Sequence, residues 1–233
     1  MLAKIAGIFF VLLLVAGVPT LSFLTARQRH LRFVPRRALY VSAILSQWLL
    51  AALGVVVVLV IFGDFAAVSF RPVASLTFLR WTLALCLAAL AFQGILLVCE
   101  HSGWWPAESE TVRLLLPETR QEKLWCVLLV APTAALCEEF VYRGYLLTQL
   151  SAWLPSRGWA WAASALAFGL AHTYQGLSGV LRAGVLGAFF AYPVLCWGSL
   201  YPSMAAHFIY DALALVWLGP HFLKFESRVD AGQ

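Results

Sequence analysis

The chain has 233 residues, of which 62% are apolar and 12% are charged, and its formal net charge is +5. A soluble domain of this length cannot bury so much apolar surface, and its charged fraction is normally about twice as large. The composition therefore excludes an ordinary soluble protein. Because roughly 20 apolar residues span the hydrocarbon layer, it predicts an all-α, polytopic bundle of about seven or eight transmembrane helices.

Much of the positive charge lies in one basic cluster after the first apolar run, formed by Arg27, Arg29, Arg32, Arg36 and Arg37. A basic cluster beside an apolar run is typical of the cytoplasmic end of a membrane span. No signature of a nucleic-acid-binding fold accompanies it. We therefore expect the lipid bilayer, and not nucleic acid, as the partner of this cluster.

The apolar runs predict the helices in chain order. The first run, 5–24, is followed by its main basic cluster, whereas a signal peptide carries that charge before the run, so we expect a retained span. Further spans are expected at 39–62, 81–99, 124–150, 159–172, 180–196 and 202–218. The most polar segment, 100–123, is expected to be a loop with some amphipathic helix at the membrane surface. Counted alternately, the spans put the N-terminus outside and the C-terminus in the cytoplasm.

Three of the expected spans carry ionisable side chains, namely Glu138, Glu139, Arg143, His172, His207 and Asp211. Each such group costs on the order of 2.5–3.5 kcal/mol at the bilayer centre unless it is paired or hydrated, so these residues are candidates for function. Glu139 and Arg143 are four residues apart and share a helix face, which predicts an ion pair. Glu138 lies about 100° around the helix and is left as a candidate general base.

Each of these features also has a structural interpretation. The Glu139–Arg143 pair alone is typical of a helix anchor, His172 alone of an interfacial residue, and the His207–Asp211 pair of a polar lock between helices. Two acids and two histidines on three spans, in a chain otherwise nearly free of buried charge, favour a site. Arg157 and Arg182 lie near predicted span ends, and we expect them to reach the interface.

Three motifs carry a family resemblance. Residues 138–143 read EExxxR, residues 168–172 read FxxxH, and residues 207–211 read HxxxD. In this order and spacing they resemble the CPBP family, also called the ABI or type II CAAX prenyl endopeptidase family. The resemblance covers roughly 123–218 and includes Gly144 after the arginine. Asp211 departs from it, because the family more often has asparagine there.

The resemblance implies an intramembrane endopeptidase of the glutamate type. Glu138, helped by His172, would activate a water molecule, His207 and Asp211 would hold the developing oxyanion, and Glu139 with Arg143 would shape the site. The substrate would be a membrane-associated peptide or protein. No cofactor is expected, although carboxylate and imidazole ligands leave a zinc-dependent version open.

The resemblance also divides the chain into N-terminal spans with a polar loop (1–122), a catalytic transmembrane core (123–219) and a short polar tail (220–233). The short loops suggest a prokaryotic plasma (inner) membrane. The oligomeric state and the substrate's identity stay open.

Two other classes of function compete with a peptidase. One is a catalytically silent membrane adaptor or immunity protein, and the other is a proton-coupled transporter.

The depth of the two histidines in the membrane is a geometric problem for a single site. Alternating spans put His172 near the cytoplasmic end of its helix and His207 near the outer end of its own, on the order of 10 Å apart in depth. A single site requires tilted spans or a segment that dips inward.

Overall fold

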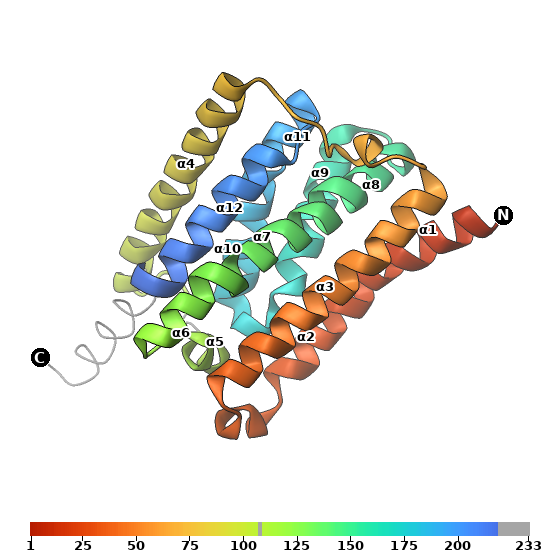
Figure 1. Cartoon of the computed structure of the whole chain (residues 1–233). Coiled ribbons are helices and arrows are strands. Elements are labelled where there is room, and N and C mark those ends of the chain that lie inside the picture. Colours follow the sequence, from red (N-terminus) through yellow and green to blue (C-terminus); the bar gives the residue numbers. More distant parts are fainter. Residues whose placement is uncertain (107–108, 219–233) are drawn as a thin grey trace, which may run out of the picture.

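The computed structural model describes residues 1–106 and 109–218, and every regular element in these ranges is a helix (Figure 1). The all-α prediction is thereby confirmed. The predicted polar tail, 220–233, lies outside the described residues.

The first hundred residues form three long helical rods. The first rod joins α1 (Leu2–Leu12), the π-helical turn η1 (Leu13–Gly17) and α2 (Val18–Ala26); the others are α3 (Arg36–Ile61) and α4 (Ser75–His101). Two short 3₁₀ segments connect them, η2 (Arg29–Phe33) and η3 (Phe65–Val68). The π turn of the first rod directly precedes the turn that holds Pro19. Proline removes one backbone hydrogen bond from a helix, and the wider turn accommodates that loss.

The rest of the described chain begins with the short helix α5 (Glu110–Leu115). A continuous rod follows, composed of α6 (Arg120–Trp125), η4 (Cys126–Val130), α7 (Ala131–Glu138), η5 (Glu139–Leu146) and α8 (Leu147–Trp153). The remaining elements are α9 (Arg157–Ala171), η6 (Thr173–Gln175), α10 (Gly176–Phe190), α11 (Tyr192–Trp197), α12 (Tyr201–Leu213) and η7 (Ala214–Leu218). The segment η5 is π-helical over eight residues and holds most of the EExxxR motif. π-helical turns occur frequently at functional sites.

Five helical rods in the described ranges are long and apolar enough to cross a membrane, at Leu2–Ala26, Arg36–Ile61, Ser75–Glu100, Arg120–Trp153 and Thr173–Trp197. The membrane-type architecture therefore agrees with the composition, while the count of seven or eight spans stays a prediction. The helix α9 has only 15 residues, which is shorter than the 18 residues taken as the minimum for a membrane-crossing helix. The rod of α12 and η7 is less apolar, because it contains His207 and Asp211.

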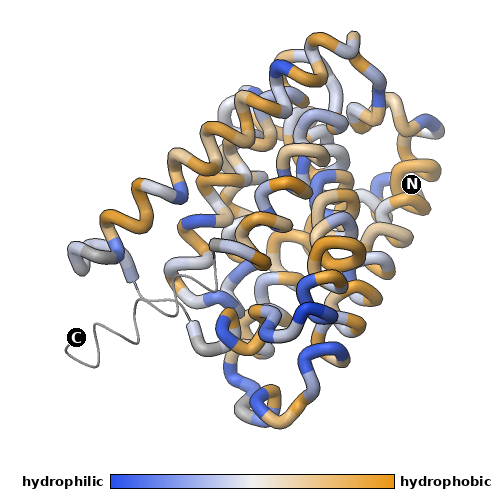
Figure 2. Tube along the Cα trace, turned by 60° about the vertical axis from the view of Figure 1, so that its left-hand side comes forward, coloured by the Kyte–Doolittle hydropathy of each residue, from blue (hydrophilic) through white to orange (hydrophobic). Residues whose placement is uncertain are grey.

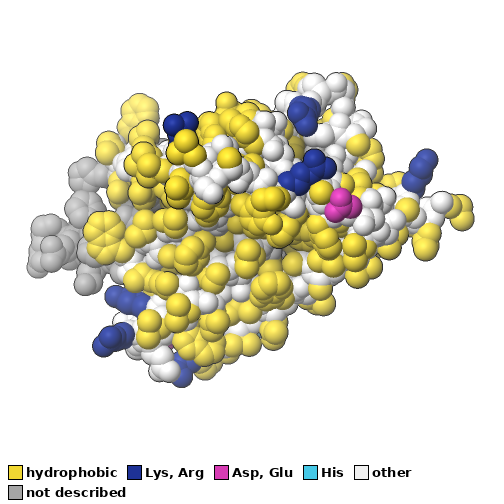
Figure 3. Space-filling model, turned by 45° about the horizontal axis from the view of Figure 1, so that its top comes forward, with side chains coloured by type: hydrophobic (Ala, Val, Ile, Leu, Met, Phe, Trp, Pro, Cys, Tyr) yellow, Lys and Arg dark blue, Asp and Glu magenta, His cyan; other side chains and the backbone are white. Residues whose placement is uncertain are grey.

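The rod 120–153 lies at the centre of the bundle, between α3 and α12 (Figure 1). Half of its most apolar stretch is buried inside the bundle, compared with 22–28% in the first three rods. The outer rods instead expose large apolar side chains, such as Leu49 and Val98. Figure 3 shows one face that is mostly hydrophobic and carries few charged side chains. Such a surface suits contact with lipid and is not expected on a soluble monomer.

The arginine cluster and the polar segment 100–123 lie at the same end of the bundle. Arg36 forms an ion pair with Glu118 at 2.5 Å, and Arg37 donates a hydrogen bond to Gln121. Tyr40 donates to the backbone carbonyl of Leu115 in α5. In Figure 2, hydrophobic residues run along the rods, and hydrophilic residues gather at the lower end, where α2 meets α3 in Figure 1. This common end agrees with alternating crossings of the first three rods.

Candidate active site

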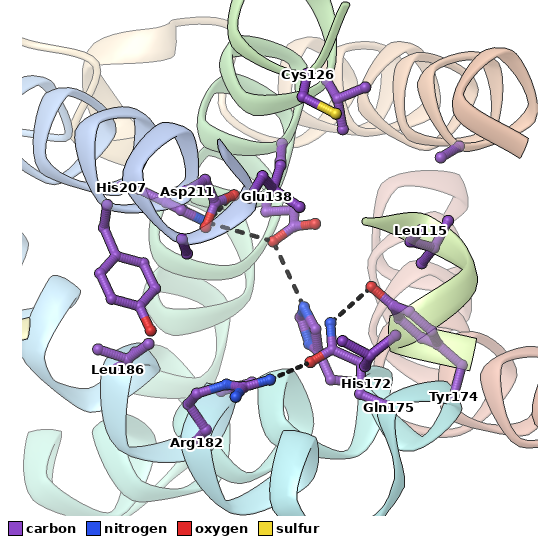
Figure 4. Close-up of a pocket in the computed structure, with 18 of the residues that line it drawn as sticks. Leu115, Cys126, Glu138, His172, Tyr174, Gln175, Arg182, Leu186, His207 and Asp211 are labelled. Atoms are coloured by element: carbon purple, nitrogen blue, oxygen red, sulfur yellow. Dashed lines mark hydrogen bonds and ion pairs between the residues drawn. The ribbon is translucent and has the colours of Figure 1, made fainter. Parts of the chain in front are cut away.

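The structure brings the six ionisable residues of the predicted spans into one cluster. Glu138 is the last residue of α7, Glu139 and Arg143 lie in η5, His172 directly follows α9, and His207 and Asp211 lie in α12. The Oε2 atom of Glu138 is 3.9 Å from the Nε2 atom of His172 and 3.9 Å from the Nε2 atom of His207 (Figure 4).

The expected separation of the two histidines in depth was therefore wrong. A helix of 15 residues, such as α9, is about 22 Å long, which is less than the roughly 30 Å of the hydrocarbon layer. The chain turns back through η6 directly after His172. The end of a short helix can thus lie at the depth of Glu138 instead of at the membrane surface.

Glu139 and Arg143 form the expected ion pair, and both side chains are buried. The Nη1 atom of Arg143 lies 3.1 Å from Oε1 of Glu139. The same oxygen accepts a hydrogen bond of 2.8 Å from Nδ1 of His207. The guanidinium also lies over the ring of Phe168, 3.8 Å from its centroid, and its Nε donates to the carbonyl of Gly187 at 3.4 Å. This pair therefore connects η5 with α9, α10 and α12.

Glycines create the space for this arrangement. A Cβ atom on Gly187 would lie 3.0 Å from Nη2 of Arg143 and 3.0 Å from Cδ1 of Phe168. A Cβ atom on Gly169 would lie 2.7 Å from the carbonyl oxygen of Val180. The helices α9 and α10 consequently approach each other closely beside the residues that carry the motif FxxxH.

The local contacts of His172 determine which of its nitrogens is available. Nδ1 lies 2.8 Å from the carbonyl oxygen of Phe168 and must donate to it, because a carbonyl only accepts. In the neutral ring, Nε2 then carries a lone pair and faces Glu138. The ring of Phe168 packs edge-on against His172, with centroids 4.6 Å apart, as the shared helix face predicted.

His207 has a different environment, since both of its nitrogens face carboxylates. Nδ1 donates to Glu139, and Nε2 lies 3.3 Å from Oδ2 of Asp211. The ring stacks on Phe190 at 5.2 Å between centroids. Ionised carboxylates only accept hydrogen bonds, so this setting favours a ring that donates from both nitrogens.

A cavity of about 250 Å³ lies beside the cluster, and only four of the six residues line it. Glu138, His172, His207 and Asp211 line it, whereas Glu139 and Arg143 do not. The cavity extends toward α5, at the end of the bundle that holds the arginine cluster, and its walls include Leu115 and Leu186 (Figure 4). Four of the residues can therefore meet a bound molecule, and the ion pair lies behind them.

Sequence reasoning missed several polar side chains of this cavity. Gln47 of α3 donates a hydrogen bond of 2.8 Å from Nε2 to Oε1 of Glu138. Arg182, expected to reach the interface, lines the cavity instead, with Nη2 3.3 Å from Oε1 of Gln175. The amide of Gln175 in turn donates to the hydroxyl of Tyr174. For Gln47, the only signal in the sequence was an amide inside an apolar span. No residue near it in sequence indicates that Glu138 is its partner.

The cluster, as it lies in the structure, does not form a complete set of zinc ligands. No group of three or more His, Cys, Asp or Glu side chains in the described part of the chain is arranged to hold a metal ion. Two ligands of one tetrahedral zinc lie about 3.3 Å apart, since each bond is about 2.0 Å. His207 and Asp211 have this separation, whereas Glu138 lies 3.9 Å from each imidazole, so only two of the side chains have the spacing of zinc ligands.

The comparisons with known proteins address the segment that carries this cluster. A family model described as "Type II CAAX prenyl endopeptidase Rce1-like" matches residues 120–213. No similar protein was found among curated proteins, and no similar solved structure was found. The match includes all six ionisable residues and excludes α1–α4, which contribute Gln47. The segment 120–213, which builds most of the cavity wall around Glu138, is thus similar to the Rce1-like type II CAAX prenyl endopeptidases, the family that its three motifs resemble.

Proposed function

We propose that the chain is an intramembrane endopeptidase of the CAAX type that hydrolyses a peptide bond in a membrane-associated protein or peptide. The observation that carries the proposal is the position of the Glu138 carboxylate, 3.9 Å from each of two imidazoles at a cavity between apolar helices. A match to a peptidase family over the same residues supports it.

The spacing between Glu138 and His172 suits an activated water molecule. Oε2 of the carboxylate and Nε2 of the imidazole are both acceptors in the forms described above, and they lie 3.9 Å apart. A water molecule about 2.8 Å from each atom donates one O–H group to each of them. Its remaining lone pairs are then free to attack a bound carbonyl carbon. This arrangement gives His172 the role of orienting the water and Glu138 that of general base.

Hydrolysis follows in two steps whose atoms balance. In the first, the water oxygen bonds to the carbonyl carbon while Glu138 takes a proton from the water. In the second, the C–N bond breaks as that proton passes to the leaving nitrogen, which yields a carboxylic acid and an amine. The same side chain is therefore first a base and then an acid.

His207 and Asp211 are proposed to stabilise the negative charge of the tetrahedral intermediate. An imidazole that donates from both nitrogens is cationic, and its Nε2 lies on the cavity side. Its two N–H groups are taken by Glu139 and Asp211, so the ring contributes a fixed positive charge beside the developing oxyanion, which lowers the barrier. Asp211 accepts from this ring and holds it, which is a different role from the donor role that an asparagine could fill.

We also propose how the chain crosses the membrane. Together, α9 and η6 make one further crossing, because Tyr174 of η6 accepts a hydrogen bond from Ser109 in the polar segment, and the rod of α12 and η7 makes another. With the five long rods the chain then makes seven crossings, with the N-terminus outside and the C-terminus in the cytoplasm. In this arrangement 1–122 and 123–219 act as a supporting part and a catalytic part. The compartment is proposed to be a prokaryotic plasma membrane.

The test is cleavage of a library of membrane-spanning peptides by purified wild type and Glu138→Gln in liposomes. Wild type is expected to cleave, and the variant is expected to lose at least about 100-fold in rate, because it keeps the shape and lacks the base. Cleavage that survives a chelator supports the metal-free route. Loss of cleavage with chelator, restored by added zinc, would contradict it.

Equal cleavage by both proteins would contradict the assignment of Glu138. If wild type cleaves no member of the library, the proposal loses to the catalytically silent adaptor. The variant's unfolding temperature in detergent provides the control for folding.

A further inference from the structure

The helix α3 contacts the central rod through three of its residues around the site, two of which are neighbours in sequence. Nε1 of Trp48 donates to the hydroxyl of Thr133 at 3.2 Å, five residues before Glu138. Nε2 of Gln47 donates to Oε1 of Glu138 at 2.8 Å. Further along, Gly54 lies so close to Phe140 that a Cβ atom would meet its ring at 3.2 Å. Two of these contacts set the register between the helices, and the third reaches the carboxylate.

The amide of Gln47 has a specific effect on that carboxylate. It occupies Oε1, so the other oxygen, Oε2, is the one that faces both imidazoles at 3.9 Å. A neutral amide orients a carboxylate and supports its ionised form without neutralising it, as a lysine or arginine would. When Oε2 takes a proton, Oε1 still accepts from the amide, so the side chain does not have to rotate during the reaction.

We propose that Gln47 is a positioning residue for the reaction, which holds the Glu138 carboxylate with Oε2 toward the water site. The inference rests on the proposed function and extends the site to α3, outside the segment 120–213 that matches the peptidase family. Gln47 lines the cavity and is half-buried, so its amide borders the space that the substrate occupies. The N-terminal helices then contribute to catalysis as well as to insertion in the membrane.

A structural role alone predicts a different result from a positioning role. Trp48, Thr133 and the close approach of Gly54 to Phe140 still hold α3 when the amide is removed. A variant that lacks the amide should therefore fold and insert. Its defect should appear in the chemical step, because a base that is free to rotate spends less time in the reactive geometry.

The experiment compares Gln47→Met, which keeps the length and removes the donor, with wild type in liposomes on one cleaved peptide. The expected result is a fall in kcat of about 10- to 100-fold with KM changed less than about twofold. The pH profile of kcat should also change, because the carboxylate loses the donor that orients it. The matched control is Gln149→Met, which removes a buried amide in α8, outside the cavity. The control should keep the wild-type kcat and pH profile.

A second measurement does not need activity. The infrared difference spectrum between wild type and Glu138→Gln isolates the carboxyl band of Glu138, and Gln47→Met should shift that band while Gln149→Met should not. A shifted band without any cleavage by wild type would support the contact and reject the peptidase. Normal kcat and an unshifted band in Gln47→Met, with cleavage by wild type, would overturn the role of Gln47 and leave the peptidase in place.

Discussion

At the scale of single residues, the two adjacent glutamates have separate surroundings. Glu138 lines the cavity, with 16% of its side chain exposed, whereas Glu139 is fully buried between Arg143 and His207. Neighbours in a helix point about 100° apart, which is why one of two adjacent acids can face a cavity while the other forms a buried ion pair. The spacing of four between Glu139 and Arg143 made this division predictable from sequence.

This division predicts that two similar substitutions affect the stability of the protein differently. Glu139→Gln leaves the Arg143 guanidinium buried without its carboxylate, and removing one partner of a buried ion pair costs about 3–5 kcal/mol. We expect a clear fall in the unfolding temperature of the purified protein in detergent. Glu138→Gln should unfold near the wild-type temperature, since its carboxylate faces the cavity. Equal unfolding temperatures for the two variants would contradict this separation of roles.

Gln47 shows where prediction of the site from sequence ends. The histidines and acids form spaced motifs on their own helices, but Gln47 is a single amide, 91 positions away from Glu138. Its partner is determined by how α3 packs on α7, and no spacing rule contains that information. Arg182 was misjudged for a similar reason, because position near a span end does not reveal which way the side chain points.

At the scale of elements, the helices were predicted well and their depth was not. The expected run 124–150 corresponds to the rod 120–153, and 202–218 corresponds to α12 with η7. Apolar periodicity defines which residues are helical. It does not say that α9 ends beside Glu138, or that π turns reset the faces of the central rod at η4 and η5. Those features depend on contacts between helices.

The close crossing of α9 and α10 provides a test at this scale. In Gly169→Ala the new Cβ atom would lie 2.7 Å from the carbonyl of Val180, so the helices must move apart beside His172. Overpacking of this kind costs about 1–3 kcal/mol, and we expect both a lower unfolding temperature and a kcat reduced about tenfold or more. The matched control is Gly184→Ala on the facing helix, whose nearest contact is an ordinary 3.7 Å. Equal behaviour of the two variants in these assays would reject the close crossing.

At the scale of the whole molecule, the arrangement of polar ends predicts how the chain crosses the membrane. The helix α3 has 26 residues, so its ends lie about 39 Å apart. The central rod starts beside Arg37 and therefore ends on the opposite side, near Arg157. If α9 crosses as well, the segment after His172 returns to the side of the arginine cluster. We expect the arginine cluster to set the orientation, because basic segments tend to stay in the cytoplasm.

Single cysteines in a background without the native cysteines test this topology. We expect Gln28→Cys and Glu118→Cys to react with a membrane-impermeant maleimide only in inverted vesicles, and Asp64→Cys and Arg157→Cys only in intact spheroplasts. All four positions are exposed, so access by the reagent depends on the side of the membrane. If Arg157→Cys reacts from the same side as Gln28→Cys, the central rod does not cross and the seven-span arrangement fails. If all four labels exchange sides, the crossings stand and the cytoplasmic assignment of the arginine cluster is wrong, which would place the cavity end beside α5 outside the cell.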